Sequence, residues 1–224
     1  MGSIAENIRR LLEGLSPGVV VVAVTKTRTP GEAMEAYNAG LRIFGENRVQ
    51  ELVSKREQLP GDISWHLIGH LQSNKVKQAV ASAAMIESVD TVRLLRLIDA
   101  EALGQGKSID CLLQVHIASE ESKSGFSIAE MMATDWGEVE SSLKAARICG
   151  VMGMATFTDD TERVRSEFRT LADLYRQLRE RYFSHDSHFR EISMGMTGDW
   201  QMAVEEGSTM IRVGTLIFGE RLKK

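Results

Sequence analysis

The sequence has few of the features that mark disulfide-bonded, membrane-spanning or nucleic-acid-binding proteins. Only two cysteines and three prolines occur among its 224 residues. No apolar run approaches the ~20 residues needed to cross a bilayer, and the residues after Met1 lack the charged-then-apolar layout of a signal peptide. Basic residues (27) do not outnumber acidic ones (31), which argues against a surface built to neutralise nucleic-acid phosphates. We therefore expect a cytoplasmic protein that binds neither membrane nor nucleic acid.

The chain also lacks the features that separate one domain from another. It contains no linker rich in proline, glycine or serine and no low-complexity tract. Apolar residues make up 43% of the sequence, which is enough for one large core. The two cysteines, Cys111 and Cys149, each lie in an apolar, strand-like run, and their spacing gives no support for a redox pair. We expect a single domain over residues 1–224, with both thiols buried and reduced.

Apolar segments of strand length alternate with helical segments along the whole chain. The strand candidates are residues 19–25, 41–44, 64–68, 84–88, 110–116, 148–152, 188–193 and 210–213. Eight strands separated by helices in about 220 residues match a (β/α)8 barrel, or TIM barrel, better than an open doubly wound sheet. The fold class predicted here is therefore α/β.

Helix signals between the strand candidates support this fold. Thr29 and Glu32 have the spacing of a capping box, with Pro30 at the first helical position. This helix is predicted to end at Gly40. Residues 4–13 are amphipathic and predict an extra helix before the first strand.

Lys26 stands directly after the first strand candidate. A strand as apolar as residues 19–25 must be covered on both faces, as in a parallel sheet wrapped by helices. Because α/β folds place their chemistry at the carboxyl ends of the strands, Lys26 is a candidate Schiff-base amine. The alternative is a strand-end lysine that simply reaches solvent.

Polar residues follow the other strand candidates, and in a barrel they converge on one mouth. This mouth is expected to be rich in amide and hydroxyl donors, such as Asn47, and poor in the paired carboxylates of a glycosidase or metal-assisted hydrolase. Ser193, Gly214 and Thr215 follow the last two strands close to helix starts, where barrels commonly bind phosphate. Glycines at these positions are also typical of tight strand–helix turns.

Arg212 lies inside an otherwise apolar strand candidate, Met210-Ile211-Arg212-Val213. A charged side chain there is costly unless it is paired or holds a ligand. A structural ion pair and a ligand contact both remain open.

Two histidine pairs have spacings that occur in metal sites. His66 and His70 lie on a strand that runs into a turn, and no carboxylate near them in sequence completes a zinc site. His185 and His188 fall in a connection that is expected to be a solvated surface loop. We therefore expect no bound metal.

Six sequence blocks together resemble the pyridoxal phosphate homeostasis protein family. They span nearly the whole chain in order, and the third is highly specific. The blocks are Val22-Ala23-Val24-Thr25-Lys26, Phe44-Gly45-Glu46-Asn47-Arg48-Val49-Gln50-Glu51, Trp65-His66-Leu67-Ile68-Gly69-His70-Leu71-Gln72-Ser73-Asn74-Lys75, Glu121-Ser122-Lys123-Ser124-Gly125, Ser193-Met194-Gly195-Met196-Thr197 with Asp199, and Ile211-Arg212-Val213-Gly214-Thr215 with Phe218-Gly219.

The resemblance implies a single-domain barrel related to the amino-terminal domain of alanine racemase. It implies that pyridoxal 5′-phosphate (PLP) is held as a Schiff base on Lys26, with Arg212 facing the pyridine nitrogen. The other implied ligands are Ser193, Gly214 and Thr215 around the phosphate, and Asn47 and Met194 along the ring. One position departs from the family: many members carry a second lysine where this chain has Arg28, whereas Lys123 keeps its place.

The implied chemistry favours holding PLP over using it in catalysis. PLP is a strong electron sink when its ring nitrogen is protonated, usually opposite a carboxylate. The Arg212 guanidinium can only donate hydrogen bonds, so it would keep that nitrogen unprotonated. Racemisation also needs a second acid/base, which alanine racemase draws from a separate β domain, and 224 residues leave no room for one. We expect no catalytic residue.

Three functions remain open, in this order. The first is a PLP-binding protein of intracellular PLP homeostasis, which buffers the cofactor or delivers it to apo-enzymes. The second is a low-activity PLP-dependent amino-acid racemase or lyase. The third is an interaction protein for which PLP is a sensor ligand. We expect a monomer or a weak dimer.

Overall fold

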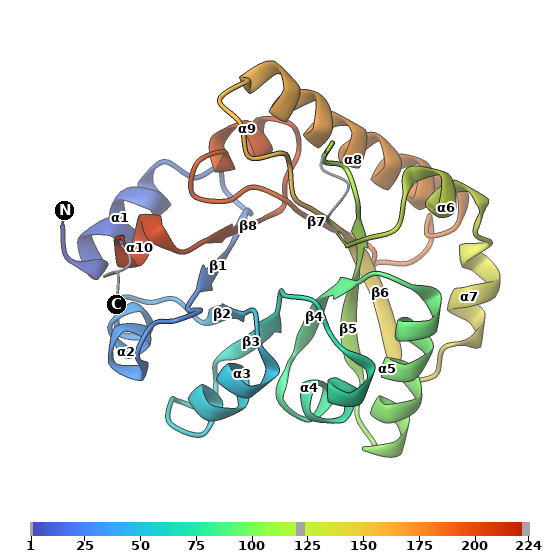
Figure 1. Cartoon of the computed structure of the whole chain (residues 1–224), viewed down its shortest axis with the longest axis horizontal. Coiled ribbons are helices and arrows are strands. Elements are labelled where there is room, and N and C mark those ends of the chain that lie inside the picture. Colours follow the sequence, from blue (N-terminus) through green and yellow to red (C-terminus); the bar gives the residue numbers. More distant parts are fainter. Residues whose placement is uncertain (1, 120–123, 221–224) are drawn as a thin grey trace.

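Eight parallel strands close into one barrel, as the sequence predicts. The computed structural model describes residues 2–119 and 124–220. Each strand pairs with its neighbours in chain order, and β8 pairs with β1 to close the sheet (Figure 1). The strands are β1 Val20–Val24, β2 Ile43–Glu46, β3 Ser64–Leu67, β4 Met85–Val89, β5 Ile109–Val115, β6 Ala146–Gly153, β7 Glu191–Ser193 and β8 Met210–Val213.

All eight strand candidates are present, and their ends differ by a few residues. The last strand, β8, has the predicted bounds. Strand β2 runs on to Glu46, beyond the predicted end at residue 44, because Gly45 and Glu46 pair with His66 and Leu67 of β3. Strand β7 begins at Glu191, three residues after the predicted start at residue 188. His188 lies in an exposed loop.

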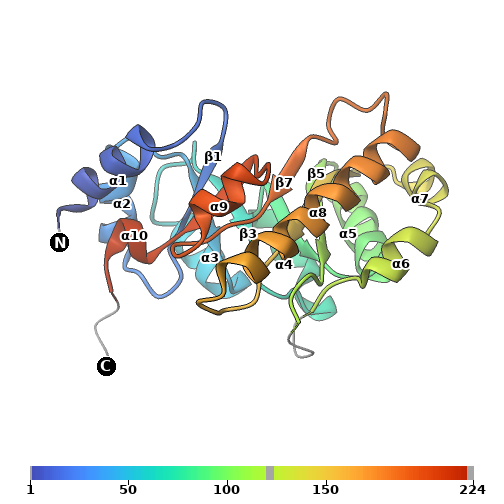
Figure 2. The same ribbon diagram turned by 90° about the horizontal axis from the view of Figure 1, so that it is seen from above.

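Helices surround the ring of strands (Figures 1 and 2). They are α1 Ile4–Glu13, α2 Pro30–Asn38, α3 Val49–Arg56, α4 Val76–Ser82, α5 Val92–Gly104, α6 Ile128–Ala133, α7 Trp136–Ser142, α8 Thr161–Arg181, α9 Trp200–Glu205 and α10 Thr215–Phe218, with a 3-10 turn, η1, at Ser73–Lys75. Within the described residues, no helix combines the length and the apolar character needed to span a membrane.

Local sequence explains where the first two helices begin. The Thr29 hydroxyl accepts the Glu32 N–H at 3.2 Å, and the Glu32 carboxylate accepts the Thr29 N–H at 2.7 Å, which completes the predicted capping box of α2. Ser3 and Glu6 make the same reciprocal pair before α1, the helix predicted at residues 4–13.

The strands separate two apolar layers. The larger layer lies between the barrel and the helices and contains most of the buried side chains. A smaller cluster fills the barrel interior, with Val22, Met85, Leu112, Cys149, Met152 and Met210. Strand side chains alternate between the two layers, so a residue two positions further along a strand points into the barrel again, nearer its carboxyl end.

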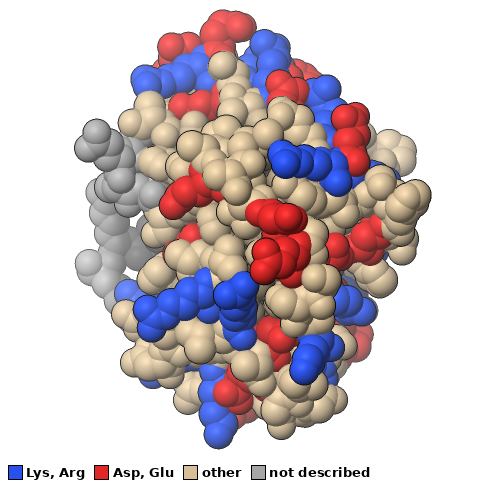
Figure 3. All heavy atoms as spheres, turned by 90° about the vertical axis from the view of Figure 1, so that its right-hand side faces the viewer, with Lys and Arg blue, Asp and Glu red and all other residues tan. Residues whose placement is uncertain are grey.

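Figure 3 shows the face of the molecule on the right-hand side of Figure 1. Acidic and basic side chains are interspersed over this face, without a broad region of one sign. This mixture matches the small excess of acidic residues in the sequence.

Candidate functional site

A cavity of about 520 Å³ opens at the carboxyl ends of the strands. Its walls include five residues that the sequence analysis selects: Lys26, Asn47, Arg212, Gly214 and Thr215. These residues come from the ends of β1, β2 and β8, so the barrel brings together positions up to about 190 residues apart. The cavity is therefore the candidate functional site.

The floor of the cavity is a polar layer that lies above the apolar interior cluster. Along β4 and β8, Met85 and Met210 belong to that cluster, and the next inward positions are Glu87 and Arg212. The same step along β5 leads to Gln114, which lines the cavity. The barrel is thus filled with apolar side chains at one end and with polar side chains at the functional end.

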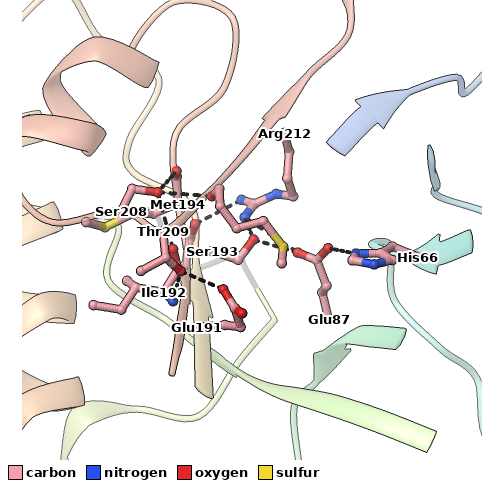
Figure 4. A network of polar contacts seen from close by, with 11 residues as sticks. His66, Glu87, Glu191, Ile192, Ser193, Met194, Ser208, Thr209 and Arg212 are labelled. Atoms are coloured by element: carbon pink, nitrogen blue, oxygen red, sulfur yellow. Dashed lines mark hydrogen bonds and ion pairs between the residues drawn. The ribbon is translucent and has the colours of Figure 1, made fainter. Parts of the chain in front are cut away.

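Arg212 is held inside the barrel by a chain of hydrogen bonds that Figure 4 shows. Its Nη1 donates to Ser193 Oγ at 2.6 Å, and Nη2 donates to the Gly153 carbonyl at 3.0 Å. Ser193 Oγ donates in turn to Glu87 Oε2 at 2.6 Å, and Glu87 Oε1 lies 2.7 Å from His66 Nδ1. The guanidinium is therefore paired and also forms part of the cavity wall, and its contact with a ligand stays a prediction.

Glu87 supplies the negative charge of this buried network. Burial alone raises the pKa of Glu87, but the hydrogen bond and charge of His66, the charge of Arg212 and the Ser193 hydroxyl outweigh it and lower the pKa below 4.5. Burial lowers the pKa of Arg212, against the opposing effect of the Glu87 and Asp199 charges. Since an arginine does not deprotonate in proteins, an ionised carboxylate faces a permanent cation, at 3.9 Å.

Lys26 lies in a strained turn directly after β1. The Arg28 N–H donates to the Thr25 carbonyl at 2.9 Å, which closes a four-residue turn with Lys26 and Thr27 at its centre. Thr27 has a φ of 65°, a left-handed conformation that is rare for a β-branched residue. Its N–H is held by Glu51 Oε2 at 3.1 Å. This turn leaves Lys26 half-buried in the cavity wall.

A buried ion pair supports the same turn from outside the barrel. Lys55 of α3 donates to the Thr25 carbonyl at 2.6 Å and to the carboxylate of Glu46. Thr25 Oγ1 also donates to Glu46 Oε1, at 2.7 Å. Burial raises the pKa of Glu46, and the hydrogen bonds from Lys55 and Thr25 oppose that rise. Glu46 therefore acts on the wall behind the Lys26 turn.

Two glycines allow the loops around the cavity to approach one another. A Cβ on Gly69 would lie 2.4 Å from the carbonyl oxygen of Asn47, so the loop after β3 packs directly on the backbone of Asn47. A Cβ on Gly214 would lie 3.2 Å from the carbonyl oxygen of Val24, which brings the loop after β8 against the end of β1. The close approach of these loops fixes both Asn47 and Gly214 in the wall.

Two other predicted residues, Ser193 and Met194, do not line the cavity. Ser193 and Met194 are fully buried, Ser193 in the Arg212 network and Met194 in the outer apolar layer. Their predicted contact with a ligand stays a prediction, because it requires their side chains or backbone to become accessible from the cavity. Lys123 lies outside the described residues.

The histidine pairs are separated by the fold. His66 points into the barrel and bonds to Glu87, whereas His70 is exposed and lies 3.1 Å from Asp90. His188 lies in a surface loop, with its Nδ1 3.0 Å from Asp186. Over residues 2–119 and 124–220, no group of three or more histidine, cysteine, aspartate or glutamate side chains is arranged to hold a metal ion.

Sequence reasoning missed several members of the site. Glu87 and Gln114 are polar residues inside apolar strands, and the argument applied to Arg212 would have selected them too. Thr197 and Gly198 line the cavity in the loop after β7 and offered no comparable signal. Glu87 is the more important of these, because it balances the charge of Arg212.

Comparisons with known proteins identify the family of this chain. A family model described as alanine racemase, N-terminal domain, matches residues 1–222. Pyridoxal phosphate homeostasis proteins of Aquifex aeolicus and Synechocystis are 35% and 37% identical to this chain, over 99% and 95% of its length and 96% of theirs. The chain belongs to the pyridoxal phosphate homeostasis protein family.

Solved structures with similar sequences have the same barrel. PipY of Synechococcus elongatus is 36% identical and covers 97% of this chain, which covers all of PipY; the TM-score is 0.91 for PipY without PLP and 0.88 for PipY with PLP bound. Alanine racemase of Clostridium difficile, at 14% identity and a TM-score of 0.77, shares the fold, and the match covers 99% of this chain but only 57% of the racemase. This chain thus has the fold of a little over half of the racemase.

Proposed function

We propose that this protein binds PLP in the cavity at the carboxyl ends of the strands, holds it covalently through Lys26, and takes part in PLP homeostasis. The observation that carries the proposal is the charge of the cavity wall around Lys26. Among its described lining residues, Lys26, Arg28 and Arg212 are cationic and none is acidic. Such a wall suits an anionic phosphate ester that also carries an aldehyde.

The residues of the wall fit the separate parts of the cofactor. Lys26 would supply the amine that holds the aldehyde carbon, and this amine must be neutral to do so. Gly214 and Thr215, beside Thr197, offer backbone N–H groups and hydroxyls for the phosphate. Asn47 offers an amide to the ring on the side held by Gly69. PLP bound in this way would supply an electrophilic imine carbon and a conjugated ring.

Arg212 makes strong catalysis unfavourable at this site. The buried carboxylate of Glu87 keeps the guanidinium charged and fixed, and a guanidinium offers only N–H donors to a ring nitrogen. A ring nitrogen placed there would act as an acceptor and stay unprotonated, so the bound cofactor would be a weak electron sink. A role in holding and delivering PLP is therefore favoured over a low-activity racemase or lyase.

We also propose where the protein acts and which proteins receive PLP from it. The chain has the sequence characteristics expected of a cytoplasmic protein, and the proposed recipients of PLP are apo-enzymes that use it. We expect a monomer or a weak dimer to carry out this role, because the proposed site lies within one barrel.

Borohydride trapping tests the covalent attachment. The purified protein incubated with PLP should show the visible absorbance of an imine. Reduction should then fix the label on the peptide that contains Lys26. Lys26→Ala should abolish the fixed label, whereas Lys77→Ala, at an exposed lysine of α4 outside the cavity wall, should keep it. A protein that takes up no PLP, or a label mapped to another lysine, would contradict the proposal.

Exchange of α-protons distinguishes a carrier from an enzyme. A panel of amino acids in deuterated buffer should show little or no exchange with the PLP-loaded protein. Exchange at about 10 turnovers per second, an ordinary value for enzymes, would favour the racemase or lyase alternative.

A further inference from the structure

The guanidinium of Arg28 joins the Lys26 turn to the last helix of the chain. Nη1 donates to the Phe218 carbonyl at 3.3 Å and to Glu32 Oε1 at 3.2 Å, and Nη2 donates to the Gly219 carbonyl. The guanidinium also lies over the Phe218 ring, 5.7 Å from its centre. Only 10% of this side chain is exposed, so these contacts are made at a largely desolvated position.

The helix that Arg28 holds is continuous with the loop proposed to bind phosphate. Helix α10 has four residues and follows Gly214 directly, so its first residue, Thr215, lies in the cavity wall. Asn7 of α1 holds the same helix from the other side, through a 2.9 Å bond from Nδ2 to the Ile217 carbonyl. A helix this short has little stability of its own. Its position therefore depends on such contacts at its carboxyl end.

The strained turn after β1 aims Arg28 at α10. Thr27 is held in the left-handed region between Lys26 and Arg28, and such a conformation persists only where the surroundings determine it. The hydrogen bonds of Arg28 to α10 and of Glu51 to Thr27 hold Thr27 in this conformation. The same turn thus sets the direction of Lys26 on one side and the position of the phosphate loop on the other.

We propose that Arg28 is a positioning residue for the phosphate subsite: it fixes α10, and thereby Gly214 and Thr215, relative to Lys26. This inference rests on the proposed function. In this chain a lysine would not make the same contacts, because one ammonium at the end of a flexible stem does not reproduce the planar guanidinium that contacts two carbonyls and a carboxylate together. With arginine at position 28, phosphate recognition therefore depends on the planar geometry of the guanidinium as well as on its charge.

The test compares PLP with pyridoxal, which has the aldehyde and ring but no phosphate. Dissociation constants for both compounds are measured by absorbance titration of the wild-type protein, Arg28→Gln and Arg28→Lys. Arg9→Gln, at an exposed arginine of α1 paired with Glu13, is the matched control. Asn7→Ala loosens α10 from the side away from the cavity and keeps Arg28.

The expected result is a selective loss of phosphate recognition. Arg28→Gln and Arg28→Lys should bind PLP roughly tenfold more weakly or worse, since charge-assisted hydrogen bonds are lost, and should bind pyridoxal as the wild type does. Asn7→Ala should show the same selective loss to a smaller extent, and Arg9→Gln should show none.

Several results would overturn the inference. Wild-type affinity for PLP in Arg28→Lys would show that only the charge matters, and equal losses for PLP and pyridoxal would show a general effect on the fold or on Lys26. A wild-type protein that binds PLP and pyridoxal equally well would remove the phosphate subsite and this inference with it. Failure of Lys26 labelling, in contrast, would overturn the proposed covalent attachment, so the two failures are distinguishable.

Discussion

Among the single side chains, Thr27 shows how the fold stores strain beside a proposed reactive group. Its φ of 65° follows from the turn that joins Lys26 to Arg28, and its side chain is exposed. A non-glycine residue in such a conformation costs about 1–3 kcal/mol, and glycine removes that cost while adding about 0.5–1 kcal/mol of chain entropy to the unfolded state. The free-energy cost of the left-handed conformation is therefore larger than the entropy cost that glycine would add.

We expect Thr27→Gly to stabilise the protein by about 1 kcal/mol, because the strain relief exceeds the entropy cost. Urea unfolding followed by circular dichroism measures the change in the free energy of unfolding. Thr27→Ala is the control, since alanine removes the side chain but retains the strain. Equal effects of the two substitutions would show that the side chain, and not the backbone angle, is responsible.

Arg212 shows what a single position can and cannot reveal. Its place in an apolar strand correctly indicates a special role, and the structure adds that Ser193 and Glu87 contact it and that His66 bonds to Glu87. The surroundings matter because replacing Arg212 by a carboxylate would place two buried acids together, which raises the pKa of one of them. A test of the ring-nitrogen argument must therefore change Glu87 together with Arg212.

At the level of secondary structure, Asp99 joins α5 to the start of β6. Its Oδ1 accepts the backbone N–H groups of Lys144, Ala145 and Ala146 at 2.8, 2.7 and 2.8 Å. Burial alone raises the pKa of Asp99, but these three bonds outweigh it and lower the pKa below 3.8. A carboxyl whose folded pKa is depressed stabilises the fold above its unfolded pKa and loses that effect as the pH falls through the folded value.

Asp99→Asn should therefore destabilise the protein by about 1–3 kcal/mol at neutral pH, since it removes charge-assisted bonds to three N–H groups. The difference from the wild type should narrow as the pH falls below 3.8, because the carboxyl of the unfolded wild type then binds a proton while the folded one is still ionised. Urea unfolding between pH 3 and pH 7 measures this difference.

The control for Asp99→Asn is Asp173→Asn, whose carboxylate is half exposed in a surface ion pair with Arg176. It should change the free energy of unfolding by less than about 0.5 kcal/mol. A difference between Asp99→Asn and the wild type that stays constant down to pH 3 would show that geometry, and not charge, is lost.

As a whole, the barrel has no open edge at which part of the sheet could separate, because β8 pairs with β1. The two cysteines report on the layers on either side of that sheet. Cys111 of β5 belongs to the outer apolar layer and Cys149 of β6 to the interior cluster. Burial raises the pKa of Cys149 to about 12 and the pKa of Cys111 well above its ordinary value.

We expect neither thiol of the native protein to react with Ellman's reagent, since the thiolate is the reactive form and both groups are buried. Both should react together, with the same dependence on urea, when the single barrel opens. A third thiol at an exposed position, Thr170→Cys, should react at once and serves as the control. Faster reaction of one native cysteine would show that one layer opens without the other.

The predictions from sequence succeed where a local pattern has a local cause. The eight apolar segments, the capping box at Thr29 and the helix at residues 4–13 are all present in the structure. The order of segments also placed Lys26, Gly214 and Thr215 at strand ends, and a barrel brings all strand ends to one mouth. Ser193 was placed at the same mouth, but its side chain is committed to Arg212 and Glu87 below the cavity.

Strand length, helix caps and chain order are enough to predict the kind of barrel and which residues stand at its mouth. Which polar residues share the barrel interior depends on the tertiary structure. A parallel strand is buried on both faces, so its sequence does not show which residues point inward. The pairing of Glu87 with Arg212 and the reach of Arg28 to α10 therefore depend on how distant strands and loops are brought together.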